Sequence, residues 1–296
     1  MKDLLKQVVF TLMLINIIAC GETPTSLLNE PFPVIRPGPF GMGFSFIPNT
    51  VFQMGAPEDE YQRQDDESQH WVKLTKGFWI QTMELTISQW MKVTSKKPVY
   101  TNYGWCTGRS LGTSTDDLES NMPITCIEWE TVTKFIDVLN ERTSDEGYTY
   151  RLPTEAEWEL AARTFAKNNY PRTYSEFKSA RESQKDYAWC GGENRRNSFV
   201  NPHPVGELKP NSFGLYDTLG NVSEWVYDTY DAQYQKADKY EQAIVNPRVT
   251  GTASTRVRRG GSLAGDINYC RIAARRAFQQ DLARHDTGFR LVRTVK

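Results

Sequence analysis

The chain has 296 residues, of which 39 % are hydrophobic, and its 35 basic and 36 acidic side chains leave a formal net charge of −1. A chain of this length and apolar content can bury a sizeable core, and we expect one large domain rather than two small ones. The balanced charge gives no reason to expect nucleic acid as a partner, nor a membrane surface held by bulk electrostatics.

The N-terminal segment has the pattern of an export signal. Lys2 and Lys6 precede an apolar run of twelve residues, 8–19, which is shorter than the roughly 20 residues that a bilayer crossing needs. The run ends in Ile18-Ala-Cys20, which resembles a bacterial lipobox and predicts that Cys20 is the lipidated first residue of the mature protein. An ordinary signal, or a buried helix with a chance cysteine, is the alternative.

We therefore divide the chain into a lipoprotein signal peptide (1–19), a tether (20–43) and one domain (44–296). The tether contains five prolines, which favour a stiff, extended chain. A lipid at Cys20 would anchor the protein in the bacterial cell envelope, either in the periplasm or on the outer surface.

Four cysteines remain after Cys20, an even number in a compartment that permits disulfides. Three pairings are possible. Cys106 and Cys126 bracket a polar loop rich in Gly, Ser and Thr, and we favour a bridge there, which would stabilise the fold by about 3 kcal/mol. Cys190 and Cys270 either pair or remain free buried thiols.

The first part of the domain is predicted to form short strands and then a helix. The predicted strands are 44–48, 51–55, 71–75 and 78–80. The charged segment 58–70 between them is expected to be a solvated loop. Thr86, followed three residues later by Gln89, forms a capping box that predicts the start of a helix.

Two further helices are indicated downstream. Apolar residues recur at spacings of three and four over 129–139, and Gly147 is expected to end that helix. Thr154 and Glu157 form a second capping box. The apolar face of the helix that follows, which we interpret as tight packing, carries Trp158, Ala161, Ala162 and Phe165. Beyond Tyr170 periodic runs are few, and irregular structure is predicted.

Five short motifs are dense in Gly, Pro, Trp and Asn, residues that shape turns or fill large volumes. They are Arg151–Glu159, Asn211–Asp217, Gly220–Trp225, Arg259–Ser262 and Gly288–Val292. In this order they resemble the formylglycine-generating (sulfatase-modifying) enzyme superfamily, whose domain is related to the C-type lectin fold. The resemblance runs from about Phe44 to Val292. It implies an α+β domain with short helices, small antiparallel sheets and much irregular structure.

The resemblance also implies bound calcium, which prefers carboxylate and carbonyl oxygens. The implied ligands are the carboxylates of Asp217 and Glu224 and the carbonyls of Gly220 and Val222. A second, weaker site would use Asn197, where an Asp is usual, and the carbonyl of Phe199.

Catalytic members of the superfamily hold copper through two thiolates, one of them three residues after the Ser of Gly-Gly-Ser. Ser262 matches that Ser, but the third residue after it is Gly265. Counting five more gives Cys270, although alignment on Arg275 displaces this match by two positions. Because Cu(I) needs soft ligands, copper is not expected here, and Ser262 and Cys270 are only weak catalytic candidates.

Other departures from the pattern agree with this. Ser223 replaces a usual Trp, and Leu263 replaces a usual aromatic residue, both where the superfamily lines its reaction cleft. His70, His203 and His285 are widely spaced, so a histidine-rich iron centre is not expected either.

We place the candidate ligand-binding face in the C-terminal segment, about residues 256–290. Its candidate contact residues are Leu263, Ala264, Gly265, Asp266, Ile267, Asn268, Arg276, Phe278, Gln280, Arg284 and His285. Residues 256–296 carry nine Arg and one Lys against three Asp, an excess that could attract an acidic partner. The alternative is that several arginines are buried partners of carboxylates. The arginines concerned are Arg259, Arg271, Arg275 and Arg290, with Glu155, Glu157, Glu224 and Asp228 as partners.

The sequence thus predicts an exported bacterial lipoprotein that binds a protein or other surface ligand and is not a copper oxidase. Its architecture is similar to a branch of exported lipoproteins that carry the ligand-binding face in the C-terminal segment, some of them diversified there by a retroelement. Two alternatives remain: an oxidase or maturation enzyme of the sulfatase-modifying type with an altered metal site, and a structural component of an envelope machine.

Overall fold

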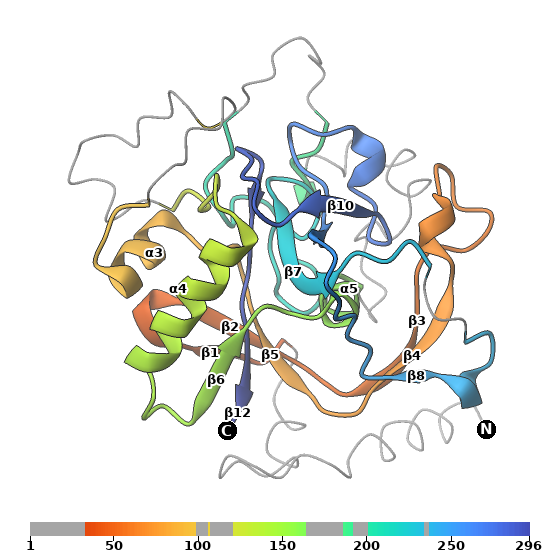
Figure 1. The fold of residues 1–296 in the computed structure, drawn as a ribbon, viewed down its shortest axis with the longest axis horizontal. Coiled ribbons are helices and arrows are strands. Elements are labelled where there is room, and N and C mark those ends of the chain that lie inside the picture. The colour runs from red at the N-terminus through yellow and green to blue at the C-terminus, as the bar shows by residue number, and fades with distance from the viewer. Residues whose placement is uncertain (1–32, 99–105, 107–120, 164–185, 192–200, 234–236) are drawn as a thin grey trace.

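The computed structural model describes residues 33–98, 106, 121–163, 186–191, 201–233 and 237–296. The α-helices within this part are α3 (Ile87–Thr94), α4 (Trp129–Arg142) and α5 (Glu155–Ala162), and short 3-10 turns occur at Pro39–Gly41, Asp65–Glu67, Tyr240–Gln242 and Ile267–Tyr269. Helices and several small sheets are mixed along the chain, which confirms the α+β prediction (Figure 1).

An antiparallel sheet of five strands forms one side of the domain. In spatial order its strands are β1 (Ile35–Pro37), β2 (Gly43–Ile47), β5 (Phe78–Gln81), β12 (Val292–Val295) and β6 (Tyr148–Arg151). Helices α3 and α4 lie beside this sheet (Figure 1). The core between them is aromatic: the ring of Trp90 stacks on Phe135 at 4.7 Å, and Phe135 meets Phe289 edge-on at 5.6 Å. Such aromatic packing buries large apolar areas and fixes the helices on the sheet.

The capping signals predicted the helix starts correctly. The Thr86 side chain accepts a hydrogen bond from the backbone N–H of Gln89, and the Gln89 side chain accepts one from Thr86. Thr154 and Glu157 form the same reciprocal box at the start of α5. Helix α4 ends earlier than predicted, at Arg142, because the next residues turn well before Gly147.

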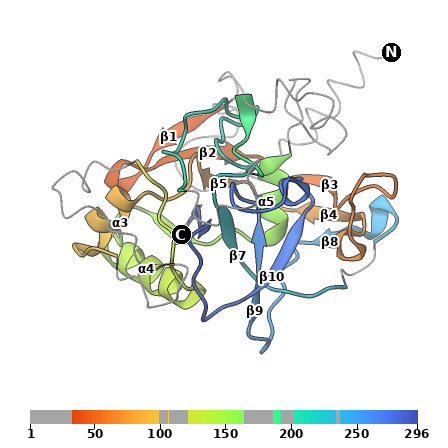
Figure 2. The same ribbon diagram turned by 90° about the horizontal axis from the view of Figure 1, so that it is seen from above.

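The prediction of irregular structure beyond Tyr170 is wrong for part of that region. A four-stranded sheet lies there, in the order β10 (Arg275–Gln279), β9 (Thr255–Arg259), β7 (Ser223–Thr229) and β11 (Thr287–Gly288) (Figure 2). Strand β9 reads Thr-Arg-Val-Arg-Arg, so buried arginines occupy positions where a strand usually carries apolar residues.

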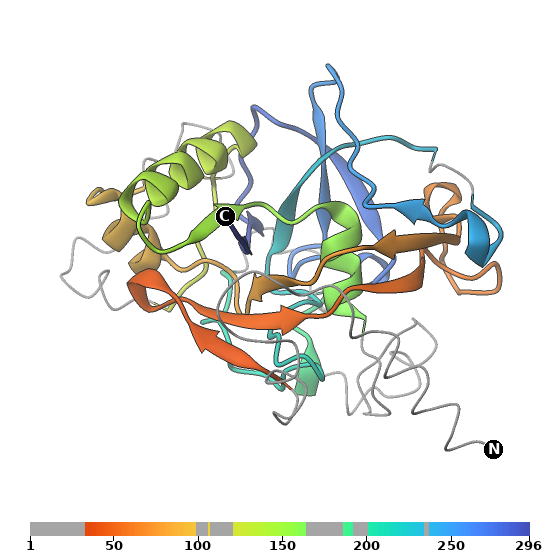
Figure 3. The same ribbon diagram turned by 90° about the horizontal axis from the view of Figure 1, so that it is seen from below.

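The third sheet consists of β3 (Thr50–Met54), β4 (His70–Leu74) and β8 (Ile244–Val245). Helix α5 packs against β3 as well as against β7 and β9, so it joins this sheet to the four-stranded one (Figure 3). All eight residues of α5 are buried, including its three glutamates. The interpretation of tight packing is therefore confirmed, except for Phe165, which lies outside the described residues.

Two predicted boundaries differ from the structure. Val34 and Met42 are buried and β1 pairs with β2, so the domain includes residues assigned above to the tether. The charged segment 58–70 is not simply solvated, because the carboxylates of Glu60 and Glu67 are buried against Arg271.

The predicted signal peptide, Cys20 and most of the tether lie outside the described residues. Within the described part, none of the helices combines the length and apolar character that a membrane crossing requires.

Candidate functional site

The cysteines form two disulfides. Cys106 and Cys126 are paired, as predicted, with their Cα atoms 5.8 Å apart. Cys190 and Cys270 are also paired, across 80 residues of sequence, which decides between the two alternatives left open above. Every cysteine in the described part is thus oxidised. A copper site needs thiolates, and with Gly265 at one position and a disulfide-bonded Cys270 near the other, the residues present do not fit copper.

Buried arginines pair with buried carboxylates around α5. Arg275 donates two hydrogen bonds to Glu155 at 2.8 and 2.6 Å, and Arg259 lies against Glu159 and 3.6 Å from Glu155. The nearby charges of Arg163 and Arg259 outweigh burial and lower the pKa of Glu159, so that this carboxylate stays ionised. The excess of C-terminal arginines is therefore partly internal.

The same pattern recurs in two further ion pairs. Arg271 donates to Glu67 at 2.6 and 2.7 Å, and Arg290 donates to Glu224 twice, both at 2.7 Å. All four arginines expected to be buried partners are indeed buried and paired. Two of the four expected carboxylates take other partners: Glu157 pairs with Arg151 at 2.6 Å, and Asp228 accepts the backbone N–H groups of Glu155 and Val249.

The two predicted calcium-binding carboxylates differ in the hydrogen bonds that they already accept. Both carboxylate oxygens of Glu224 accept hydrogen bonds, from Arg290 and from the indole N–H of Trp158 at 2.8 Å. Asp217 accepts the backbone N–H of Gly206 through Oδ2, whereas its buried Oδ1 has no hydrogen-bond donor in the described part. Asp217 therefore has an oxygen to offer a cation, but Glu224 already holds a guanidinium.

Glu84, which the sequence did not single out, is fully buried beside this segment. Its carboxylate accepts the backbone N–H of Val222 at 3.1 Å and the side-chain amide of Asn221 at 2.7 Å. Burial and the charge of Asp217 raise the pKa of Glu84 well above its usual range, and burial raises the pKa of Asp217 to about 6. No group of three or more His, Cys, Asp or Glu side chains in the described residues is arranged to hold a metal, and Asn197 and Phe199 lie outside those residues.

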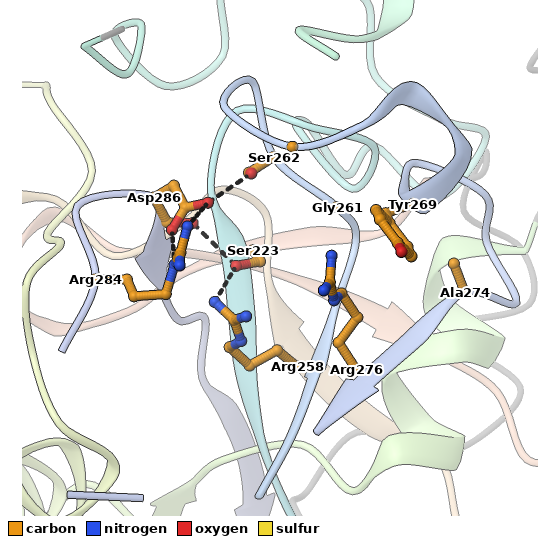
Figure 4. Close-up of a pocket in the computed structure, with 10 residues that line it drawn as sticks. Ser223, Arg258, Gly261, Ser262, Tyr269, Ala274, Arg276, Arg284 and Asp286 are labelled. Carbon is orange, nitrogen blue, oxygen red and sulfur yellow. Dashed lines mark hydrogen bonds and ion pairs between the residues drawn. The ribbon is translucent and has the colours of Figure 1, made fainter. Parts of the chain in front are cut away.

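A hollow of about 90 Å³ opens on the face of the four-stranded sheet that α5 does not cover (Figure 4). We call it the arginine hollow. It is lined by Ser223, Arg258, Gly261, Ser262, Gly265, Tyr269, Ala274, Arg276, Arg284 and Asp286. These residues come from β7, β9, β10, the loop after β9 and the loop before β11, so segments distant in sequence meet there.

The arginine hollow contains part of the predicted ligand face. Gly265, Arg276 and Arg284 line it, together with the weak candidate Ser262. Leu263 and His285 are 96 % buried, so their side chains support the surface from beneath instead of presenting it. The remaining candidates are not lining residues: Ala264, Asp266, Ile267, Asn268, Phe278 and Gln280.

Asp286 organises one wall of the arginine hollow. Its Oδ2 accepts the hydroxyl of Ser262 at 2.9 Å, and its Oδ1 accepts Nε of Arg284 at 2.8 Å. Burial alone would raise its pKa, but the Arg284 hydrogen bond and the charge of Arg258 together lower the pKa of Asp286 below its usual range. Asp286 is therefore ionised at neutral pH and already paired with Arg284.

Arg258 lies at the base of the arginine hollow. Within the described residues it forms no ion pair with a carboxylate. Its Nη1 donates to the hydroxyls of Thr287 at 2.5 Å and Ser223 at 3.3 Å, while its buried Nε donates to no described atom. The guanidinium stacks on the ring of Phe278 at 4.2 Å. Burial lowers the pKa of Arg258 to about 10. It remains charged at neutral pH, and no carboxylate of the described residues forms an ion pair with it.

Arg258 is a functional candidate that the sequence reading missed. The available signal was its position next to Arg259 on a strand, because adjacent strand residues point to opposite faces of the sheet. Ser223 was noted as a replacement for a larger residue, and in the structure its small side chain lies directly beside the Arg258 guanidinium (Figure 4).

Comparison with known proteins gives consistent results. Residues 31–295 match the family described as the sulfatase-modifying factor enzyme 1-like domain. The formylglycine-generating enzyme of Thermomonospora curvata is 30 % identical over 194 residues, covering 63 % of this chain and 60 % of the enzyme. Matches to two further formylglycine-generating enzymes span 52 % and 44 % of their lengths. The chain thus matches only about half the length of these relatives.

Two other similarities cover more of both chains. The chaperone protein LppX of Paenibacillus barcinonensis is 27 % identical over 247 residues, which is 73 % of this chain and 80 % of LppX. The solved structure of Treponema denticola variable protein 1 superposes with a TM-score of 0.66 at 25 % identity, covering 88 % of this chain and 99 % of the other.

Proposed function

Because the chain belongs to the family of sulfatase-modifying factor enzyme 1-like domains, we propose that it is a ligand-binding member of that family and not a copper oxidase. One observation carries this proposal: Gly265 stands at one thiolate position, and Cys270, near the other, is bonded to Cys190. Without a thiolate pair there is no soft donor set for Cu(I).

An activity assay tests the proposal that the protein is not a copper oxidase. The purified domain, supplied with copper and a peptide containing a substrate-type cysteine, should produce no aldehyde detectable by mass spectrometry. A catalytic formylglycine-generating enzyme, assayed in parallel, supplies the positive control. Turnover comparable to that control would overturn the proposal and favour an oxidase or maturation enzyme with a different metal arrangement.

We propose that the ligand is a protein and that it contacts the C-terminal face, about residues 256–290, around the arginine hollow. The similarity to a chaperone over most of both chains supports a protein ligand. The similarity to a variable protein over nearly the whole domain supports the binding role. The lipobox-like ending at Cys20 supports an envelope location, with the domain held by a lipid anchor.

Site-specific photo-crosslinking in intact cells tests the face. A photoreactive amino acid at Ala264, which is exposed on the loop bordering the arginine hollow, should give a discrete crosslinked product. The same amino acid at Val138, exposed on the remote helix α4, is the matched control. Equal products at both positions, or none at position 264, would contradict the proposed face. Incorporation of labelled palmitate, abolished by Cys20→Ser, tests the anchor.

We also propose that calcium binds at Asp217, supported by its buried, undonated Oδ1. If this is correct, calcium should raise the melting temperature of the wild type but not of Asp217→Asn. Magnesium serves as the control, because it demands a tighter octahedral site. An equal response of both proteins to calcium would contradict this assignment.

A further inference from the structure

Each face of the β9–β10 ladder carries a pair of opposed arginines, but only one of the two pairs is held by carboxylates of the protein. Two pairs of arginines lie directly opposite each other across the strands: Arg259 faces Arg275, and Arg258 faces Arg276. Like charges directly opposite on a sheet destabilise it, so each pair needs an anion nearby. We call the first the buried pair and the second the open pair.

The buried pair has its anions within the protein. Glu155 holds Arg275 with two hydrogen bonds and lies 3.6 Å from Arg259, which also contacts Glu159. Both carboxylates come from α5, which covers that face of the strands. The fold thus shows what such a pair of arginines binds: a carboxylate placed between the two guanidinium groups.

Among the residues that the structure describes, neither arginine of the open pair forms an ion pair with a carboxylate, although the charge of Asp286 favours that of Arg258. Arg258 donates hydrogen bonds to two hydroxyls and stacks on Phe278. Burial, together with the charges of Arg284 and Arg276, outweighs the favourable charge of Asp286 and lowers the pKa of Arg258. Arg276 stacks on the ring of Tyr269 at 3.9 Å and forms no ion pair in the described part of the chain. Asp286 is committed to Arg284 and Ser262. With three arginines and one aspartate, the lining of the arginine hollow carries a net excess of two positive charges.

The geometry of this site is set before any ligand arrives. Phe278 supports the Arg258 guanidinium at 4.2 Å, and Tyr269 supports that of Arg276, so both are restrained by ring contacts. Both side chains come from neighbouring strands and line the same hollow, with the Arg258 guanidinium directed to Ser223 (Figure 4). Restrained guanidinium groups recognise planar acids with little loss of side-chain freedom.

From this we propose that the arginine hollow binds a carboxylate of an acidic peptide segment, which enters between Arg258 and Arg276 as Glu155 does on the buried face. The inference rests on the proposed ligand-binding function and names the chemical group that the face selects. The hollow of about 90 Å³ suits one carboxyl group and not a long side chain. The peptide backbone would remain outside, near β10, which is an edge strand of its sheet.

Binding can be measured at the arginines themselves. Nitrogen-15-labelled protein would be titrated with acetate, and then with an acetylated, amidated tetraglutamate peptide, while the Nε–Hε resonances of the arginines are followed by NMR. The resonances of Arg258 and Arg276 should shift together and saturate with both probes. A tetraglutamine peptide of the same shape should not shift them. Failure of acetate and tetraglutamate to move these two resonances would overturn the proposal.

Inorganic phosphate and sulfate form the second arm, because a phosphoryl or sulfuryl group also pairs with arginine. The carboxylate proposal expects tetraglutamate to bind more tightly than either ion at equal ionic strength. Tighter binding of phosphate or sulfate would show that the hollow selects another class of anion.

Substitutions locate the site. Arg276→Gln should weaken tetraglutamate binding by roughly 10- to 100-fold, because it removes one charge-assisted hydrogen-bond donor group. Arg248→Gln is the matched control: Arg248 also stacks on a tyrosine ring, Tyr227 at 3.6 Å, but lies in a different surface depression. Arg276→Glu, which places a carboxylate opposite Arg258, should abolish binding and leave the fold intact.

Equal losses from Arg276→Gln and Arg248→Gln would overturn the inference, since binding would then reflect general positive charge. The crosslinking experiment at Ala264 distinguishes failure of the proposed function from failure of the carboxylate proposal. A non-acidic protein captured there would sustain the proposed function and refute the carboxylate, whereas tetraglutamate binding without any captured protein would sustain the carboxylate and refute the function.

Discussion

Two sides of the same pair of strands differ in how they compensate positive charge. On the α5 side, arginines are buried in ion pairs with glutamates. On the open side, the contacts of the equivalent arginines within the described part are with hydroxyls and aromatic rings, and the nearby Asp286 is hydrogen-bonded to Arg284. Buried ion pairs are costly to break, whereas an uncompensated charge beside solvent can accept a ligand. The contrast teaches that an arginine-rich sequence does not itself mark a binding surface; the position of the carboxylates decides it.

The largest effect is expected where the compensation is complete. Glu159→Gln would leave Arg259 and Arg163 facing a neutral amide in a fully buried site, and we expect the free energy of unfolding to fall by about 5 kcal/mol. Urea denaturation measures it. The control is Glu141→Gln on the exposed side of α4, which should change stability by less than about 0.5 kcal/mol. Similar values for both variants would refute the structural role of the buried arginines.

The disulfide beside the arginine hollow is expected to contribute almost as much. Replacing Cys190 and Cys270 by serine opens a connection across 80 residues and should cost about 4 kcal/mol, against about 3 kcal/mol for Cys106 and Cys126, which are 20 residues apart. Thermal and urea unfolding of the two double variants test this order. The reverse order would mean that strain or denatured-state structure outweighs loop length.

The stability of the domain should depend on pH through Asp228, a buried carboxylate near α5 whose described hydrogen bonds come from backbone N–H groups and not from an arginine. Burial and the charge of Glu155 raise the pKa of Asp228 to about 7, whereas an unfolded aspartate ionises near pH 4. Between these values the folded state holds one more proton than the unfolded state, so stability should fall as the pH rises from about 4 to about 7, with a slope of at most about 1.4 kcal/mol per unit.

Asp228→Asn tests this assignment. The variant should lose less stability than the wild type as the pH rises through that window, as measured by urea unfolding at a series of pH values. Parallel pH profiles of the two proteins would show that Asp228 is ionised throughout and that its two backbone N–H donors stabilise the charge.

The smallest effect is expected on the open face. Arg276→Glu should replace a repulsive cross-strand pair by an attractive one and raise the free energy of unfolding by roughly 0.2–1 kcal/mol. Differential scanning calorimetry at low and high salt measures it, because salt should reduce the gain. A destabilised variant would contradict the view that Arg258 lacks an anion in the free protein.

Local signals made much of the fold predictable. Both capping boxes depend on residues three apart, and the helix starts at Ile87 and Glu155 follow from them. The order of the Gly- and Trp-rich motifs indicated the family because such turns and large side chains tolerate few replacements.

The C-terminal sheet was not predictable in the same way. Strands are recognised by alternating apolar residues, and β9 and β10 bury arginines instead. Their partners lie far away in the sequence: Arg275 and Glu155 are separated by 120 residues. For the same reason the arginine hollow was only partly foreseen. Nothing local distinguishes Arg258 from Arg259, although one faces the hollow and the other faces α5.

The position of β12 has a consequence for how the domain forms. Residues 292–295 lie between β5 and β6, and those two strands have no direct ladder with each other. A chain emerging from the ribosome therefore cannot complete this five-stranded sheet until residues 292–295 have been synthesised. Folding that depends on such long-range strand pairing is slow. The polypeptide therefore stays unfolded, and able to pass through a narrow channel, for longer than a chain whose neighbouring strands pair in sequence order.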